Sequence, residues 1–254
     1  MAASASDDKI KTLAGSPQTE RDGKQAFAAE LRRSSIPDAE LADNLGVYLT
    51  RQNLSRMLFI QELYAQILHV HGVIMEFGVR WGQNMALFAN LRGIHEPFNY
   101  NRQIIGFDTF DGFPAVSPED GDKVAAGDYS VSDDYLAKLT AILAYHEANA
   151  PIAHKRKFAL VQGDATRTLP AYLSDHPETI VSLAYFDFDI YAPTRACLEA
   201  LKPHLTRGSV LAFDELNCPE FPGETIAVRE VLGLSNVALR RSPHSPLTSY
   251  CIID

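Results

Sequence analysis

Acidic side chains follow two strongly apolar segments of the sequence, at the point where each segment ends. Asp187 and Asp189 come after the first segment, and Asp214 and Glu215 come after the second. Carboxylates buried together repel one another and are costly unless a cation or protons compensate them. Oxygen ligands favour Mg²⁺, with Ca²⁺ or Mn²⁺ as alternatives. The pattern predicts a divalent-cation site; the other interpretation is that two of the acids cap helices and the others face solvent.

A glycine loop follows an earlier apolar run. Glu76 lies near the end of that run, and Gly78 and Gly82 come next, before a helical pattern begins. Glycine allows positive φ and a close approach of a ligand to the backbone, and the free N–H groups of a helix start bind carboxylates or phosphates. The spacing differs from the G-x-G-x-x-G of dinucleotide sites. The loop indicates either a small-molecule site or only a tight turn.

Two more acids follow the apolar runs that come next. Asp108 lies thirty residues after Gly78, where a carboxylate can accept hydrogen bonds from both hydroxyls of a ribose. Asp164 is placed to accept from an exocyclic adenine amine. The alternative for both is a helix cap or a turn. We expect Phe107 and Phe110, on either side of Asp108, to lie in the core instead of stacking on adenine.

These acids need a scaffold that brings the ends of the apolar runs together. Short apolar runs separated by helical patterns are typical of a mostly parallel sheet covered on both faces, and ligands bind at the carboxyl ends of its strands. The sequence therefore predicts an α/β, Rossmann-like fold with seven strands. The expected strands are 73–77, 103–107, 158–161, 179–186, 209–213, 237–239 and 249–253, and the expected helices are 84–91, 133–148, 194–205 and 224–232.

The first part of the chain has a different character. Residues 1–25 are polar and predict a flexible tail, and 24–33 predict a short helix that ends before Pro37. A helical pattern over 38–69 is expected to cover the sheet, cap a ligand site or form an oligomer contact. We divide the chain into 1–40, a tail with a short helix, and 41–254, one domain with a helical prelude.

Composition narrows the class of protein. The 254 residues are 46% apolar and 22% charged, as expected of a chain that buries a core. A formal net charge of −9 argues against a nucleic-acid partner. No run is long enough to span a membrane, no secretory signal is recognisable, and the three cysteines form no C-x-x-C pair. We expect a cytoplasmic protein that acts on small molecules without a membrane partner.

Taken together, these strings resemble the macrocin O-methyltransferase family, whose members methylate sugar hydroxyls in antibiotic biosynthesis. The similarity covers roughly residues 45–254. It is carried by Met75-Glu76-Phe77-Gly78-Val79 with Gly82, by the string GFDTFDGFP at 106–114, by DFDIY at 187–191 with Thr194, and by Phe213-Asp214-Glu215. The run 217–224 resembles a subgroup that acts on nucleotide-linked or pathway deoxysugars.

The resemblance implies a class I fold that binds S-adenosylmethionine (SAM). It implies that Glu76, Gly78 and Gly82 line the methionine end of SAM. It also implies that Asp108 and Thr109 hold the ribose and that Asp164 and Ala165 approach adenine, while the segment around Thr50 and Arg51 closes over the cofactor.

For the chemistry, the resemblance implies that Asp187, Asp214 and Glu215 bind Mg²⁺ and that Asp189 is the general base. The acceptor would be a sugar or nucleotide sugar, and a homo-oligomer is expected. The chain departs from the family pattern at Glu215, where relatives often have Asp, and at Arg80-Trp81 in the glycine loop, where relatives often have Trp-Arg.

Three other classes of function remain open at this point. A catechol-type, Mg²⁺-dependent O-methyltransferase would use a similar fold on a phenolic acceptor. An NAD(P)-binding oxidoreductase shares the fold class, although the missing G-x-G-x-x-G counts against it. A non-catalytic interaction protein is the third, if the acids only cap helices.

Overall fold

The computed structural model describes residues 18–254, so the predicted flexible tail up to residue 17 lies outside the described residues. Seven strands form one sheet in this range, in the order β3-β2-β1-β4-β5-β7-β6. β1 to β5 run parallel, and β7 runs antiparallel to both of its neighbours. The strands are β1 Val73–Phe77, β2 Ile104–Asp108, β3 Phe158–Gln162, β4 Val181–Phe186, β5 Leu205–Phe213, β6 Arg240–Arg241 and β7 Ser249–Ile252. The predicted mostly parallel, seven-stranded α/β fold is confirmed.

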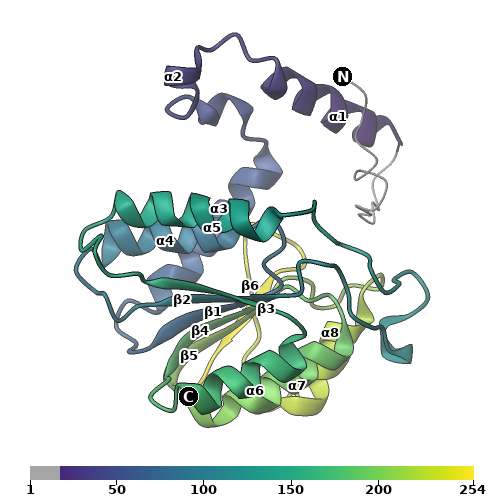
Figure 1. The fold of residues 1–254 in the computed structure, drawn as a ribbon. Helices are drawn as coiled ribbons and strands as arrows, with labels where there is room; N and C mark the ends of the chain where they lie inside the picture. Colours follow the sequence, from purple (N-terminus) through teal and green to yellow (C-terminus); the bar gives the residue numbers. More distant parts are fainter. Residues whose placement is uncertain (1–17) are drawn as a thin grey trace.

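Helices cover both faces of the sheet (Figure 1). One face carries α3 (Arg51–Gln66), α4 (Gln83–His95) and α5 (Tyr135–Ala148), and the other carries α6 (Ala165–Asp175), α7 (Tyr191–Leu201) and α8 (Pro222–Val231). Successive strand residues point to opposite faces, so Ile74 joins the core under α3–α5 while Met75 joins the core under α6–α8. No helix of the described residues is long and apolar enough to cross a membrane.

A row of stacked phenylalanines lies at the carboxyl ends of the central strands. Phe107, Phe77, Phe186 and Phe213 sit in register on β2, β1, β4 and β5. Their ring centroids are 5.2, 4.9 and 5.4 Å apart along the row. This apolar layer keeps the carboxyl ends of the four strands in register with one another. The acidic residues lie at these ends or follow directly after them. Phe107 and Phe110 both lie in the core, as predicted.

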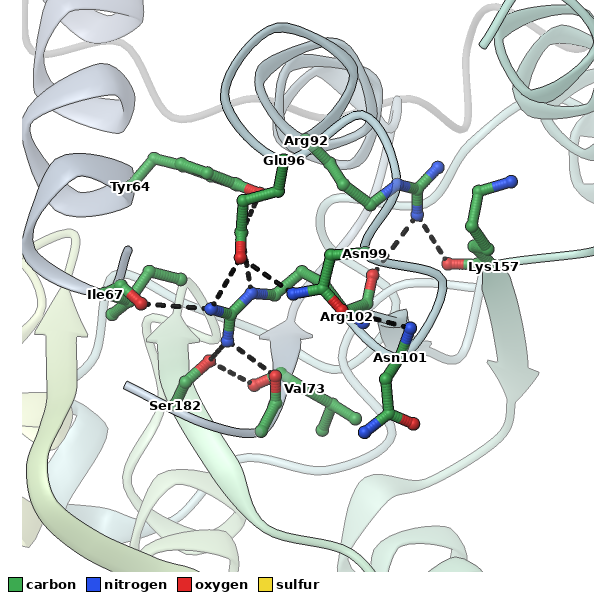
Figure 2. A network of polar contacts seen from close by, with 11 residues as sticks. Tyr64, Ile67, Val73, Arg92, Glu96, Asn99, Asn101, Arg102, Lys157 and Ser182 are labelled. Carbon is green, nitrogen blue, oxygen red and sulfur yellow. Dashed lines mark hydrogen bonds and ion pairs between the residues drawn. The ribbon is translucent and has the colours of Figure 1, made fainter. Parts of the chain in front are cut away.

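A hydrogen-bond network around Arg102 links the amino ends of the strands, opposite the acidic residues. Arg102 is 2% exposed and donates to Gly72 O at 2.6 Å, Ser182 Oγ at 2.7 Å, Ile67 O at 3.0 Å and Glu96 Oε2 at 2.9 Å (Figure 2). A buried charge is tolerated only when it is paired and hydrogen-bonded, and each donor here has a partner. The network joins α3, α4 and the starts of β1, β2 and β4 on the side away from the acids.

The N-terminal segment extends away from this body. It consists of α1 (Gln18–Arg32), α2 (Asp38–Leu41) and the 3₁₀ turn η2 (Leu45–Tyr48), and Figure 1 shows α1 and α2 projecting beyond α3. Neither α2 nor η2 buries a residue. Large apolar side chains remain exposed on this segment and on the start of α3: Phe27, Leu31, Leu45, Val47, Leu49, Leu54 and Leu58.

The structure differs from the predicted elements in several places. The helix predicted over 24–33 begins earlier, at Gln18, and the helical pattern over 38–69 divides into α2, η2 and α3. The helix α6 was not predicted. Pro170 lies inside it, where proline normally breaks a helix. Burial of Leu169 and Leu173 against the sheet outweighs that cost.

The prediction of a strand at 237–239 is wrong in its position along the sequence. The paired residues are Arg240 and Arg241, which form the exposed edge strand β6. Val237 instead packs against the core under α6–α8. Charged residues are typical of edge strands because they discourage pairing with other chains. Short 3₁₀ turns, η3 (Pro118–Asp120) and η4 (Lys202–His204), complete the fold.

Candidate active site

A cavity of about 490 Å³ opens at the carboxyl ends of β1 to β5. This volume lies in the range of small-molecule sites. Thr50 and Arg51, expected to close over the cofactor, do not line the cavity, although Gln52 and Asn53 of the same segment do. The other sequence-predicted site residues all lie at its wall: Glu76, Gly78, Gly82, Asp108, Thr109, Asp164, Ala165, Asp187, Asp189, Asp214 and Glu215. The expectation that the strand ends gather these residues is therefore met, while the role of each remains to be argued from its contacts.

The glycine loop passes very close to the end of β4. Gly78 has φ +91°, and a Cβ atom at this position would overlap the carbonyl oxygen of Asp187. Gly82 has φ +74° and is the N-cap of α4. Glycine is needed at both positions because other residues rarely adopt such backbone angles. The loop therefore lies directly against the end of β4. Gln83 and Asn84, at the start of α4, line the cavity.

Glu76 is a buried acid that faces this cavity. It is 1% exposed, and its Oε2 has no hydrogen-bond partner among the described residues. Burial, followed by repulsion from Asp187, raises the pKa of Glu76 well above its usual range. A ligand that brings a positive charge or an N–H group would satisfy this oxygen and stabilise the carboxylate.

Asp108 fastens two loops at the cavity wall. Its Oδ2 accepts from the Arg80 N–H at 2.8 Å, and its Oδ1 accepts from the Phe110 N–H at 2.5 Å. Burial raises the pKa of Asp108, although these N–H groups favour the ionised form. Asp108 thus stabilises a turn, which is the alternative that the sequence left open. Asp108 also lines the cavity, where its carboxylate can accept from a ligand hydroxyl.

Asp164 caps helix α6. Its Oδ1 accepts from the Thr166 N–H at 2.9 Å and from the Thr166 hydroxyl at 2.8 Å. This is the capping alternative that the sequence left open. Asp164 and Ala165 nevertheless line the cavity, and Asp164 Oδ2 takes part in neither of these two bonds.

The four acids after β4 and β5 interact strongly with one another. Burial and the charges of Asp187, Glu215 and Asp214 raise the pKa of Asp189 well above its usual range. Burial and the neighbouring Asp214 raise the pKa of Glu215 to about 7. The same causes raise the pKa of Asp187. Such shifts are typical of functional sites, where like charges are held together.

Arg56 of α3 neutralises part of this charge, and its role was not predicted from sequence. Its guanidinium lies 2.6 Å from Asp187 Oδ2 and 3.2 Å from Asp214 Oδ1. Arg56 Nε also donates to Asn84 Oδ1 at 3.3 Å, and the Tyr185 hydroxyl donates to Asp214 at 2.6 Å. A sequence signal existed, because Arg56 shares the helical spacing of the buried Phe59, Ile60 and Leu63.

The structure is similar to solved methyltransferase structures. A crystal structure of CalS11, a calicheamicin methyltransferase, has 44% identity over 94% of this chain and 95% of that chain, with a TM-score of 0.90. An apo structure of CalS11, a TDP-rhamnose 3'-O-methyltransferase of calicheamicin biosynthesis, has 41% identity over 94% and 96%, with a TM-score of 0.83. The chain belongs to the O-methyltransferase family of CalS11.

Membership in this family confirms the predicted resemblance and excludes the oxidoreductase and non-catalytic alternatives. The O-methyltransferase NovP shares the fold, with 19% identity over 78% of this chain and 79% of that chain and a TM-score of 0.61. No protein-family model matches this chain, and no curated protein does.

The carboxylates of Asp187, Asp214 and Glu215 in this O-methyltransferase offer the oxygen ligands and the negative charge that suit a divalent cation. Arg56, however, already forms ion pairs with Asp187 and Asp214. Among residues 18–254, no three His, Cys, Asp or Glu side chains are grouped to hold a metal ion. Glu215 Oε2 is nevertheless buried without a hydrogen-bond partner in that range, and carboxylate oxygens suit Mg²⁺. Asp187, Asp214 and Glu215 could therefore hold the ion once Arg56 withdraws from them.

The other side of the cavity consists of the loop after β2. Phe113, Pro114 and Tyr129 line it, and the Arg80 guanidinium lies 4.7 Å from the centre of the Tyr129 ring. This contact joins the glycine loop of the O-methyltransferase to the loop after β2. Neither Arg80 nor Tyr129 was predicted as a site residue, because nothing in the sequence spacing brings the two segments together.

Proposed function

We propose that this chain is a SAM-dependent O-methyltransferase that methylates a hydroxyl of a deoxysugar, nucleotide-linked or attached in a natural-product pathway. The observation that carries the proposal is the single cavity lined by the glycine loop and by the acids of five strand ends. The acceptor class is supported by 41% identity to CalS11, a TDP-rhamnose 3'-O-methyltransferase.

SAM would lie along the ends of β1, β2 and β3. Glu76 Oε2, which has no hydrogen-bond partner among the described residues, would accept a hydrogen bond from the ammonium group of the methionine part of SAM. Asp108 and Thr109 would bind the ribose hydroxyls, and Asp164 and Ala165 would contact adenine, with Gly78 and Gly82 allowing the close approach. The cavity wall carries many more carboxylates than cations, which favours the positive sulfonium.

Asp189 would act as the general base. It lines the cavity and is 8% exposed. As the acceptor oxygen forms its bond to the methyl carbon, the C–S bond breaks and the hydroxyl proton passes to Asp189, leaving S-adenosylhomocysteine and a methyl ether. Burial and the neighbouring acids raise the pKa of Asp189, and a cation bound by those acids would favour the ionised form that accepts the proton.

Mg²⁺ would be held by Asp187, Asp214 and Glu215. When bound, it would supply a Lewis acid that lowers the pKa of a sugar hydroxyl and fixes its orientation. The extra carbon of Glu215, compared with aspartate, gives that carboxylate a longer reach to the ion. Glu224 Oε2 accepts from the Glu215 N–H at 3.0 Å and so holds the backbone at this position.

Self-association and a cytoplasmic location also belong to this proposal. Seven large apolar side chains are exposed on the N-terminal segment and the start of α3, and a homo-oligomer would cover them. Cys197, Cys218 and Cys251 are all free thiols, as expected in a reducing compartment.

The test is a turnover assay with SAM, a TDP-deoxysugar and, in parallel, a catechol, each with Mg²⁺. Mass spectrometry should detect a methylated sugar and S-adenosylhomocysteine, and Asp189→Asn should abolish product while retaining cofactor binding. Methylation of the catechol alone would favour the catechol-type alternative, and wild-type turnover by Asp189→Asn would remove Asp189 from the base role.

A further inference from the structure

Asp120 is a buried acid outside the cavity wall, on the loop that follows β2. It is 1% exposed and ends the 3₁₀ turn η3. Its Oδ2 accepts from the Ser117 N–H at 2.7 Å, which closes its own turn. Its Oδ1 accepts from the Tyr191 N–H at 2.6 Å, a residue 71 positions away. One carboxylate therefore joins two distant segments.

The second segment is the turn that carries Asp189. Tyr191 is the first residue of α7, and the N-cap residue Ile190 provides no side-chain cap. Asp120 thus supplies the cap that the local sequence lacks, and a carboxylate is also favoured by the dipole at a helix start. The backbone of Asp189 has φ +63°, a conformation that costs energy in a residue other than glycine.

Gly223 packs directly against the Asp120 carboxylate. A Cβ atom on Gly223 would overlap Asp120 Oδ1 and would also lie 2.7 Å from the Tyr191 nitrogen. Gly223 is the second residue of α8, next to Glu224, whose carboxylate accepts from the Glu215 N–H. The starts of α7 and α8 and the turn η3 therefore meet at a single carboxylate.

We propose that Asp120 is a positioning residue that caps α7 from the loop after β2 and holds the strained Asp189 turn in its reactive geometry. The inference rests on the proposed function, because it takes Asp189 as the base. Asp120 itself contacts η3, α7 and α8 and does not line the cavity.

The physical reason is the sensitivity of proton transfer to distance. A base must lie within hydrogen-bond reach of the hydroxyl in the bound complex. Without the cap, the Tyr191 N–H becomes a buried donor with no partner, and the turn can relax toward ordinary φ values, carrying Asp189 with it. The same carboxylate closes η3, in the loop whose Phe113, Pro114 and Tyr129 line the cavity, so its loss should also weaken acceptor binding.

The test compares Asp120→Ala with Asp120→Asn, whose amide oxygen can still accept from the Tyr191 N–H. Asp120→Ala should lower kcat by about 100-fold, the cost of a misplacement of about 1 Å, raise KM for the acceptor and leave the Kd of S-adenosylhomocysteine unchanged. Asp120→Asn should recover most of the lost kcat. Ser209→Ala is the control, since Ser209 is also buried and joins two segments, Val181 and Thr206, away from the cavity.

A double-mutant cycle asks whether Asp120 works through Asp189. If it does, Asp120→Ala should cause little further loss of kcat in an Asp189→Glu background, which keeps a carboxylate and measurable turnover but already displaces that carboxylate. Fully additive losses would overturn the proposal. Gly223→Ala should reproduce the kinetic pattern of Asp120→Ala, because its methyl group displaces the carboxylate from Tyr191.

Hydrogen exchange provides a readout that does not depend on turnover. In Asp120→Ala, amide exchange in residues 187–193 should become faster, while exchange in β1 stays at the wild-type rate. Unchanged exchange in 187–193 would show that Asp120 does not hold the turn. Wild-type turnover by Asp189→Asn would instead show that the assignment of the base is wrong.

Discussion

Arg56 lies against Asp187, with its Nη2 atom 2.6 Å from Asp187 Oδ2. The arginine comes from α3, which precedes the first strand, whereas Asp187 follows the fourth. The guanidinium also reaches Asp214 at 3.2 Å. The charge that balances the acid cluster in this structure is thus supplied by the helical prelude. A cation that binds these carboxylates must compete with it.

Replacing Arg56 should expose this competition. Arg56→Gln leaves two partly buried carboxylates without their counter-charge, so the metal-free protein should lose about 1–3 kcal/mol of stability. Mg²⁺ should bind more tightly to Arg56→Gln than to wild type in calorimetric titrations, because no guanidinium has to be displaced. Arg51→Gln on the same helix should leave both quantities unchanged. Equal Mg²⁺ affinity in wild type and Arg56→Gln would rule out competition.

Glu215 should make the stability of the metal-free protein depend on pH. Its pKa is about 7 in the folded protein because of burial and Asp214, and about 4.3 in an unfolded chain. The folded state therefore binds the proton more tightly, so this contribution to stability is complete below about pH 4 and is lost as pH rises through about 7. The Tm should fall between pH 5 and 8, and less steeply in Glu215→Gln.

The control for this pH effect is Glu40→Gln, a substitution on the exposed helix α2. It should retain the wild-type slope of Tm against pH. Identical slopes in wild type and Glu215→Gln would mean that Glu215 does not gain a proton on folding.

Gly78 should not tolerate a side chain. Gly78→Ala places a Cβ against the Asp187 carbonyl at φ +91°, so thermal unfolding should show a loss of about 1–3 kcal/mol or more, with weaker binding of S-adenosylhomocysteine. Gly93→Ala is the matched control: it lies inside α4 with no atom within 4 Å of the added Cβ and should stabilise by about 0.5–1 kcal/mol. Wild-type cofactor affinity in Gly78→Ala would contradict the close approach of this loop.

The Arg102 network should support the fold without taking part in binding. Arg102→Met leaves Glu96 and two backbone carbonyls without their donor (Figure 2), which should cost about 3–5 kcal/mol in denaturant unfolding. Cofactor affinity at temperatures where the protein stays folded should not change, because the network lies at the opposite ends of the strands. Arg207→Met, at an exposed position, should change neither the free energy of unfolding nor the cofactor affinity. A weaker cofactor affinity in Arg102→Met would link this network to the site.

The strands and the acids could be predicted because both depend on short-range pattern. Asp108, Asp187 and Asp214 each end or follow an apolar run, and parallel strands place such ends along one edge of a sheet. The alternation that sends Ile74 and Met75 to opposite faces is likewise local. The fold and the position of these acids in the cavity wall follow from these features.

Contacts between distant segments were not predictable in this way. Arg56 reaches Asp187 across 131 positions, and Asp120 reaches Tyr191 across 71. Spacing marks Arg56 as part of a buried helix face, but it does not say which carboxylate the guanidinium meets. Helix α6 was not predicted either, and packing of Leu169 against the sheet overrides the local effect of Pro170.

The central claim is that the cavity at the strand ends binds SAM, and calorimetric titration with S-adenosylhomocysteine tests it most directly. Wild type should bind with micromolar affinity, with or without Mg²⁺, and Asp108→Asn should bind more weakly because the ribose hydroxyls lose a charged acceptor. Absence of binding in both conditions would contradict the assignment of this cavity as the cofactor site.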